Sequence, residues 1–262
     1  MPIGRLTRGT TGTNRLRRVD RWIAQLPALR RAVAPIVVDL GYGASATTTL
    51  ELQQRLSAVR PDVEVVGIEI DPERVRIASA SARPGLSFRL GGFEVPLDGG
   101  AGATVIRVLN VLRQYDESEV PGAWKLMVSR LQPDGVLVEG TCSELGRVAS
   151  WVDATAVGPR TLTISLRLAD LERPSIVAER LPKVLIHRNV DGERVHDYLA
   201  DLDRWWRVHA PLGVYGPSQR WVAVAASMRD EGWPIVGTKA RWRLGELGVA
   251  WDAIAPVGFS WS

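Results

Sequence analysis

The stretch Val37-Val38-Asp39-Leu40-Gly41-Tyr42-Gly43-Ala44-Ser45 decides the fold of this chain. A short apolar run that ends in an acid is typical of a buried parallel strand, here expected over 36–40. Gly41 and Gly43 allow backbone angles that other residues avoid, and they let a ligand approach the main chain. The helix expected from Thr47 offers unpaired N–H groups at its start to a carboxylate. The stretch therefore predicts a strand, a tight turn and a helix that together bind a ligand.

Strands and helices alternate beyond this stretch. Apolar runs predict further strands at Val63–Ile70, Leu86–Leu90, Thr104–Leu109 and Val136–Thr141. Apolar residues at helical spacing, or a proline suited to a first turn, predict helices at Thr47–Val59, from Pro72 to about Ala82, and from Asp116 or Ser118 to Leu131. This alternation predicts an α/β fold with a Rossmann-like, doubly wound and mainly parallel sheet.

The pattern changes beyond Thr141. We expect an antiparallel hairpin, then three helices, then a last strand, at Val148–Ala154 with Thr161–Leu168, at Ser175–Leu181, Glu193–His209 and Ser218–Arg229, and at Ala240–Trp251. The chain is thus expected to comprise a basic lead and helix (1–34), a Rossmann-like domain (35–170) and a helical cap region (171–262). Most of the ten tryptophans lie beyond residue 150, where they either line an apolar substrate pocket or form core.

The composition predicts a soluble, cytoplasmic protein. Of the 262 residues, 45% are hydrophobic, so a large core can form without a metal or disulfide. The single cysteine, Cys142, excludes an intramolecular disulfide and fits a reducing compartment. No run approaches the ~18 apolar residues of a membrane span, and the basic N-terminus lacks the apolar stretch of a secretory signal. The three histidines and Cys142 show no metal-ligand spacing.

Positive charge is concentrated at the N-terminus. Residues 1–35 hold eight arginines and one acid, so they carry +7, and the rest of the chain carries −3 of the net +4. A helix capped by Asn14 is expected from Arg15 to about Ala32. The basic segment either binds phosphate or RNA, or forms a solvated helix face. A further hypothesis is that Asn14 to Trp22 covers a bound ligand as a lid.

A second signal, Val65-Val66-Gly67-Ile68-Glu69-Ile70-Asp71-Pro72, ends the next strand in an acid. Such a carboxylate can accept hydrogen bonds from both hydroxyls of a ribose. With Asp39, Gly41 and Gly43, it resembles the class I S-adenosylmethionine-dependent methyltransferases, whose first motif is an acid followed by Gly-x-Gly-x-Gly. The resemblance covers about residues 35–141 and departs at the third glycine, which is Ser45 here. A plain NAD site is the competitor, but the acid that precedes the glycines disfavours it.

The resemblance implies that S-adenosylmethionine is the cofactor. It assigns Glu69 to the ribose and Ile70 to the adenine. Family members often carry an aspartate at the position of Gly92 to hold the adenine amino group, and backbone groups near Phe93 or the carboxylate of Glu94 could replace it. The residues that the resemblance places at the cofactor are Asp39, Gly41, Tyr42, Gly43, Glu69, Ile70, Gly92, Phe93, Asn110 and Val111, the last two beside the methionine moiety.

The acceptor is not specified by these motifs. Methyl transfer mainly requires alignment and the exclusion of water, with a base only where the nucleophile must lose a proton. His187 and Tyr115 are the candidate catalytic residues. Cys142, in a segment similar to the Thr-Cys-Ser of RNA 5-methylcytosine methyltransferases, is either a nucleophile or a packing residue. A small-molecule methyltransferase is the leading hypothesis; the alternatives are an RNA methyltransferase that uses the basic segment and a non-catalytic protein that binds S-adenosylmethionine.

Overall fold

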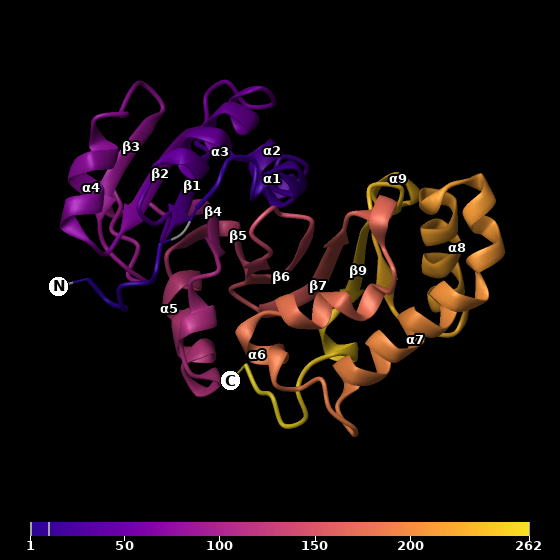
Figure 1. Ribbon diagram of the computed structural model, residues 1–262. Helices are drawn as coiled ribbons and strands as arrows, with labels where there is room; N and C mark the ends of the chain where they lie inside the picture. The colour runs from indigo at the N-terminus through magenta and orange to yellow at the C-terminus, as the bar shows by residue number, and fades with distance from the viewer. Residues whose placement is uncertain (1, 10, 262) are drawn as a thin grey trace.

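A computed structural model describes residues 2–9 and 11–261, within which nine strands form one sheet in the order β3-β2-β1-β4-β5-β6-β7-β9-β8. The strands are β1 (Ile36–Leu40), β2 (Glu64–Glu69), β3 (Leu86–Leu90), β4 (Ala103–Leu109), β5 (Leu131–Cys142), β6 (Val148–Thr155), β7 (Gly158–Leu166), β8 (Ile235–Val236) and β9 (Glu246–Ala250). The sheet runs through the whole molecule, from the indigo N-terminal half to the yellow C-terminal part (Figure 1).

The first five strands are parallel, and they confirm the predicted Rossmann-like α/β fold. β1 pairs with β2 on one side and with β4 on the other, while β3 and β5 lie outside them. The chain moves outward from β1 to β3 and then crosses back to β4. The crevice at the carboxyl ends of β1 and β4 is therefore the topological switch point, where sheets of this kind bind ligands.

The remaining strands are antiparallel. β6 and β7 form the predicted hairpin beside β5, and β9 and β8 extend the same sheet. The expectation of one strand over Ala240–Trp251 is wrong for its first part, which forms the helix α9 (Lys239–Trp242). Gly245, with a φ of 82°, separates this helix from β9.

Helices cover both faces of the sheet (Figure 1). One face is packed by α1, α2 and α3, and the other by α5 and the helices α6 to α8 of the C-terminal part. The α-helices are α1 (Arg17–Ile23), α2 (Pro27–Arg31), α3 (Thr47–Ser57), α4 (Pro72–Ser79), α5 (Val120–Val128), α6 (Lys183–Ile186), α7 (Arg194–Val208), α8 (Pro217–Asp230) and α9. The 3₁₀ helices are η1 (Asp98–Gly100), η2 (Leu112–Gln114), η3 (Glu117–Glu119), η4 (Leu168–Asp170), η5 (Pro174–Arg180), η6 (Ala210–Tyr215) and η7 (Trp251–Ala253). Among the described helices, none has the length and apolar character needed to cross a membrane.

The single helix predicted from Arg15 to Ala32 is wrong, because the segment forms α1 and α2 with a break between them. Leu26 has an extended ψ of 129°, and Pro27 starts the second helix. Proline disfavours helical geometry in the residue before it. Asn14 does not cap α1; it has a φ of 61°, and its side-chain oxygen accepts a hydrogen bond of 2.7 Å from Arg55 Nη2.

An acid is buried in the middle of the sheet at Glu139 on β5. Its residue is 1% exposed, and its carboxyl has no hydrogen-bond partner among the described residues. Burial raises the pKa of Glu139 to about 8, and the neighbouring indole of Trp124 lowers it only in part. The folded protein therefore keeps this carboxyl protonated at neutral pH, where an unfolded chain releases the proton.

Glu139→Gln should remove a pH-dependent loss of stability. Between the ordinary pKa of 4.5 and the raised pKa of about 8, the unfolded state releases a proton that the folded state retains, so stability falls as pH rises. We expect the native protein to lose stability on the order of a few kcal/mol across this window, and the variant to lose much less. Urea unfolding between pH 4.5 and 8 measures this, with the surface change Glu73→Gln as control. Parallel pH profiles for the native protein and Glu139→Gln would contradict it.

Candidate functional site

The glycine turn after β1 has the backbone geometry that its sequence requires. Gly41 has a φ of 71° and Gly43 a φ of 86°. A Cβ on Gly41 would lie 2.5 Å from Val111 Cγ2, so only glycine fits against the end of β4. Ser45, the departure from the family motif, has no positive φ, and its hydroxyl lies 2.7 Å from Thr47 Oγ1 at the start of α3. A serine is therefore accommodated where the family has its third glycine.

Asp39 at the end of β1 is engaged by the protein itself. Its carboxylate accepts a hydrogen bond of 3.0 Å from Arg107 Nε and lies 2.7 Å from Arg107 Nη2. The hydroxyls of Thr48 and Thr49 also donate to it. Arg107 binds Asp20 of α1 as well. Burial disfavours the charge of Arg107, but Asp39 and Asp20 outweigh burial and raise its pKa above the ordinary value. Asp39 lines the cavity, yet its carboxylate holds β1, β4 and α3 together.

Glu69 at the end of β2 points toward the glycine turn. Its Oε2 accepts a hydrogen bond of 2.9 Å from the backbone N–H of Gly43, and its Oε1 accepts one of 2.9 Å from the N–H of Ile70. The guanidinium of Arg74 lies 3.7 Å from Oε2. Glu69 is 1% exposed, so its carboxylate is held rigidly beside the turn.

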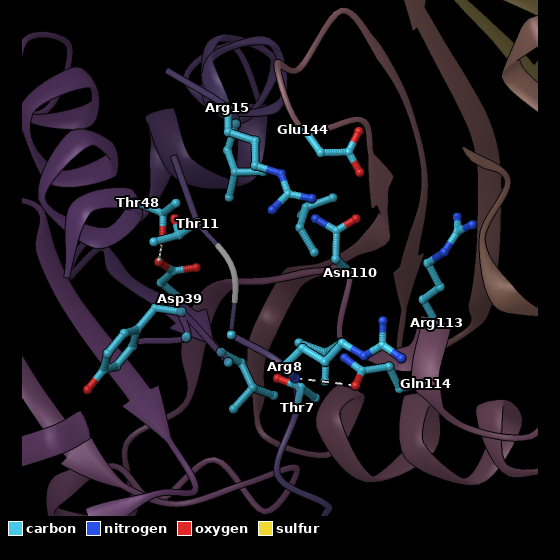
Figure 2. A pocket seen from close by; sticks show the side chains of 18 of the residues that line it. Thr7, Arg8, Thr11, Arg15, Asp39, Thr48, Asn110, Arg113, Gln114 and Glu144 are labelled. Carbon is cyan, nitrogen blue, oxygen red and sulfur yellow. Dashed lines mark hydrogen bonds between the residues drawn. The ribbon is translucent and has the colours of Figure 1, made fainter. Parts of the chain in front are cut away.

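A cavity of about 540 Å³ opens where β1 and β4 end, within the size range of small-molecule sites. Figure 2 shows Asn110 near its middle, with Asp39 and Thr48 on one side and Arg113 on the other. Asn110 has a φ of 63°; its Oδ1 accepts a hydrogen bond of 2.9 Å from the N–H of Cys142, and its Nδ2 lies 3.3 Å from Cys142 Sγ. Cys142 is buried, and its two contacts hold the side chain of Asn110 in place.

Residues 3–9, which we call the N-terminal strap, lie along the site. Ile3 forms hydrogen bonds through both of its backbone polar groups. Its carbonyl accepts a hydrogen bond of 2.8 Å from the N–H of Phe93, and its N–H donates one of 2.7 Å to Glu94 Oε2. The other carboxylate oxygen of Glu94 accepts from the N–H of Gly92 at 2.9 Å. The space left here, between the strap, Ile70 and Phe93, is about 20 Å³.

Further contacts hold the strap down to Gly9. The hydroxyl of Tyr115 accepts a hydrogen bond of 2.5 Å from the N–H of Arg5. Arg74 Nη2 donates to the carbonyl of Thr7 at 3.0 Å, and the N–H of Ala44 donates to the carbonyl of Gly9 at 3.0 Å. In Figure 1 this indigo segment passes the ends of β2 and β1 before it reaches α1.

Two glycines of the predicted set make room for the strap. A Cβ on Gly92 would lie 2.0 Å from the carbonyl oxygen of Ile3, and a Cβ on Gly43 would lie 2.7 Å from that of Gly9. The site therefore has a groove that leads from Phe93 to the glycine turn, which we call the trough. Its floor is formed by glycines, so a main chain or a ligand of similar thickness can lie in it. The aspartate that the family often has at position 92 would fill it.

The other predicted residues are divided between the site and its surroundings. Tyr115 lies at the Phe93 end, with its ring centroid 5.3 Å from that of Phe93, and Val111 lines both the trough and the cavity. Tyr42 lines the cavity and packs its ring on Phe88. His187 is exposed and lies 3.2 Å from Lys183 Nζ; it is not among the described residues that line the cavity.

The tryptophans of the second half contribute to the core. Trp151, Trp221 and Trp242 are among the largest fully buried side chains, and no tryptophan is found among the described residues that line the 540 Å³ cavity. For Trp151, Trp221 and Trp242, packing is therefore the role, of the two considered, that their burial supports.

Several arginines of the basic segment bind within the chain. Arg15 donates to the carbonyls of Cys142 and Ser143, and Arg18 donates to Ser165 Oγ and to the carbonyl of Leu244. Arg30 donates to the carbonyl of Ala24. Part of the positive charge at the N-terminus therefore fixes the segment around α1 to the rest of the fold, and Arg30 joins α2 to the end of α1. The hypothesis that Asn14 to Trp22 forms a lid over the ligand stays a prediction. The part of the chain that lies along the trough is the strap, which precedes this segment.

Sequence reasoning missed Arg107, Arg113 and Arg180. A signal existed for Arg107, because a charge inside the apolar run of β4 needs a buried partner. Arg113 and Arg180 both line the cavity, but they are far apart in the sequence. No periodicity or motif connects them.

No protein-family profile and no curated protein matches the chain. Solved structures do: an S-adenosylmethionine-dependent methyltransferase from Leishmania major (13% identity, 49% of this chain and 50% of that one, TM-score 0.36), the CcbJ methyltransferase from Streptomyces caelestis (19%, 60% and 67%, 0.35), and human N-acetylserotonin methyltransferase in complex with S-adenosylmethionine (19%, 50% and 36%, 0.37). The matched region spans about half of the first of these chains. The chain is thus similar to these methyltransferases in part of its fold.

Arg107→Met should destabilise the protein strongly. The change leaves the carboxylates of Asp20 and Asp39 buried without their shared cation, and loss of one partner of a buried ion pair costs about 3–5 kcal/mol. Urea unfolding at neutral pH measures the loss. Arg76→Met, which breaks an exposed pair with Glu73, is the matched control and should leave the unfolding midpoint unchanged. A midpoint for Arg107→Met close to that of this control would show that the buried cluster is dispensable.

Proposed function

We propose that the chain binds S-adenosylmethionine in the trough at the carboxyl ends of β1, β2 and β4 and transfers its methyl group to a small molecule in the adjoining cavity. The observation that carries this proposal is the pair of polar groups at Phe93 and Glu94. An N–H donor and a carboxylate acceptor lie side by side there, and the peptide of Ile3 satisfies both. The Watson–Crick edge of adenine offers the same two complements, an acceptor at N1 and a donor at the 6-amino group.

The rest of the trough fits an adenosine. Ile70 and the ring of Phe93 provide apolar walls beside the polar pair. The carboxylate of Glu69 lies between this end and the glycine turn, and its chemistry suits two ribose hydroxyls. The N–H groups of Gly43 and Ala44, which now donate to Glu69 and to Gly9, are donors beside the start of α3 that suit a carboxylate.

The methyl donor would extend from the trough into the cavity past Asn110 and Val111. S-adenosylmethionine supplies an activated methyl group on a sulfonium, so the protein's task is to align the acceptor and keep water away. Asn110 is held in a left-handed backbone conformation by its hydrogen bond with Cys142. Residues in this conformation that line a cavity are a feature of functional sites. Among the described residues, His187 contacts Lys183 and the hydroxyl of Tyr115 accepts from the strap, so the proposal assigns neither residue a role as a base.

The strap and an adenosine would compete for the same groups. The carbonyl and N–H of Ile3 use the donor and acceptor that the adenine needs, and only about 20 Å³ remains beside them. Binding of the cofactor therefore requires residues 3–9 to leave the trough, which lowers the apparent affinity by the fraction of molecules that are open.

The first test is calorimetric titration of the native protein with S-adenosylhomocysteine. We expect binding, and we expect Glu69→Gln to weaken it about tenfold or more, because a hydrogen bond to a charged group contributes about 1.5–3 kcal/mol. Glu64→Gln, at the exposed start of the same strand, is the matched control and should bind as the native protein does.

The adenine assignment has its own check. S-inosylhomocysteine carries a carbonyl in place of the amino group and an N–H in place of the acceptor, so both complements to Phe93 and Glu94 are reversed. Binding of this analogue as tight as that of S-adenosylhomocysteine would contradict the proposal. The proposal would also be contradicted if S-adenosylhomocysteine bound neither the native protein nor the variant Ile3→Pro, in which the strap is weakened.

Ile3→Pro should tighten the binding of S-adenosylhomocysteine several-fold. Proline has no N–H to donate to Glu94, so the strap loses a charge-assisted hydrogen bond while the trough itself is unchanged. Ile3→Ala is the matched control, because it keeps the N–H and removes only a side chain that is 48% exposed. Calorimetry on both variants measures the effect. Equal affinities for Ile3→Pro and Ile3→Ala would mean that the strap does not compete with the ligand.

A further inference from the structure

The wall of the cavity beyond Asn110 carries an excess of positive charge. Arg113 of η2 and Arg180 at the end of η5 both line it, together with Arg15 and with Arg8 of the strap. The acids among the described lining residues are Asp39, which is neutralised by Arg107, and Glu144. Glu144 lies 3.3 Å from Arg180 Nη2, but its side chain is 74% exposed, so water weakens this pair. One exposed carboxylate therefore faces four guanidinium groups, and three of them lie outside the strap.

The two arginines are held in place from behind. Arg113 Nη1 donates a hydrogen bond of 2.8 Å to the carbonyl of Glu179. The carbonyl of Arg180 accepts hydrogen bonds from the hydroxyls of Thr141 and Ser150. These contacts fix η5 against β5 and β6. Because the Arg113 side chain binds the residue next to Arg180 on this anchored segment, the two arginines can present a preformed pair of cations to a ligand.

Two like charges that line one cavity repel each other unless an anion lies between them. Burial lowers the pKa of Arg113, and the positive charge of Arg180 lowers it further. The guanidinium plane is suited to bidentate contacts with carboxylate and phosphate. An anionic group bound here would relieve the repulsion.

We propose that Arg113 and Arg180 form a subsite for the carboxylate or phosphate group of the methyl acceptor, which makes the acceptor a small anionic molecule. This proposal rests on the function proposed above. The anion is assigned to the acceptor because of the geometry of the cavity. Arg113 lies on the opposite side of Asn110 from Asp39 and Thr48 (Figure 2), whereas the N–H donors of the glycine turn lie on the same side as Asp39. The carboxylate of the methyl donor can bind at the turn, and the arginines then face the part of the cavity that the donor leaves open.

The test is calorimetric titration of inorganic phosphate and of benzoate into the native protein saturated with S-adenosylhomocysteine. We expect at least one of these anions to bind, and we expect Arg113→Gln and Arg180→Gln each to weaken it about tenfold. Affinity for S-adenosylhomocysteine should stay within about twofold of the native value in both variants. Arg76→Gln, which changes an exposed arginine on α4, is the matched control and should leave both affinities unchanged.

Three outcomes would overturn the subsite. The first is that neither anion binds the native complex. The second is that an anion binds with the same affinity to Arg113→Gln, Arg180→Gln and the control. The third is that the two variants lose affinity for S-adenosylhomocysteine but not for 5′-methylthioadenosine, which lacks the carboxylate, because the arginines would then hold the methyl donor. Failure of S-adenosylhomocysteine to bind at all counts against the proposed function alone. The anions are then titrated into the free protein, where the dependence on Arg113 and Arg180 decides the subsite.

Discussion

The buried ion pairs of Arg107 are the interaction on which the rest of the site depends. This side chain extends from β4, and it binds Asp39 at the end of β1 and Asp20 on α1. Arg55 of α3 binds the second oxygen of Asp20 at 2.5 Å, and Arg107 Nη2 also donates to the carbonyl of Thr48. One cluster of charges thus sets the relative positions of two central strands and two helices. Because the glycine turn leaves β1 directly after Asp39, the same cluster fixes the turn.

The trough and the cavity are parts of one crevice with different chemistry. The trough has glycines on its floor, an apolar wall at Ile70 and Phe93, and polar groups that a peptide or an adenine can satisfy. The cavity is more polar and is lined by arginines. A cationic methyl donor that binds in the first part and an anionic acceptor that binds in the second would meet near Asn110, and their opposite charges would favour the encounter.

The N-terminal strap gives the basic lead a structural purpose that its charge alone does not suggest. Its hydrogen bonds with the trough are made by the main chain at Ile3, Arg5, Thr7 and Gly9, so they depend little on which side chains the strap carries. A main chain presents alternating donors and acceptors, and the trough has groups of both kinds. This is why a segment without a recognisable motif can occupy a ligand site.

The sequence by itself determined the parallel half of the sheet, because apolar β-branched runs, glycine turns and proline starts are local signals that the burial of each strand reinforces. The positions of Gly41, Gly43 and Glu69 at the switch point followed from the same pattern. The resemblance added the backbone at Phe93 and the carboxylate of Glu94, which could replace an aspartate at the position of Gly92. Only the tertiary structure decided that residues 3–9 lie in the trough, that Asp39 binds Arg107, and that Arg113 and Arg180 line one cavity. These contacts join residues separated by about 60 to 90 positions, and the free energy of such contacts depends on burial and charge in three dimensions, which no local pattern encodes.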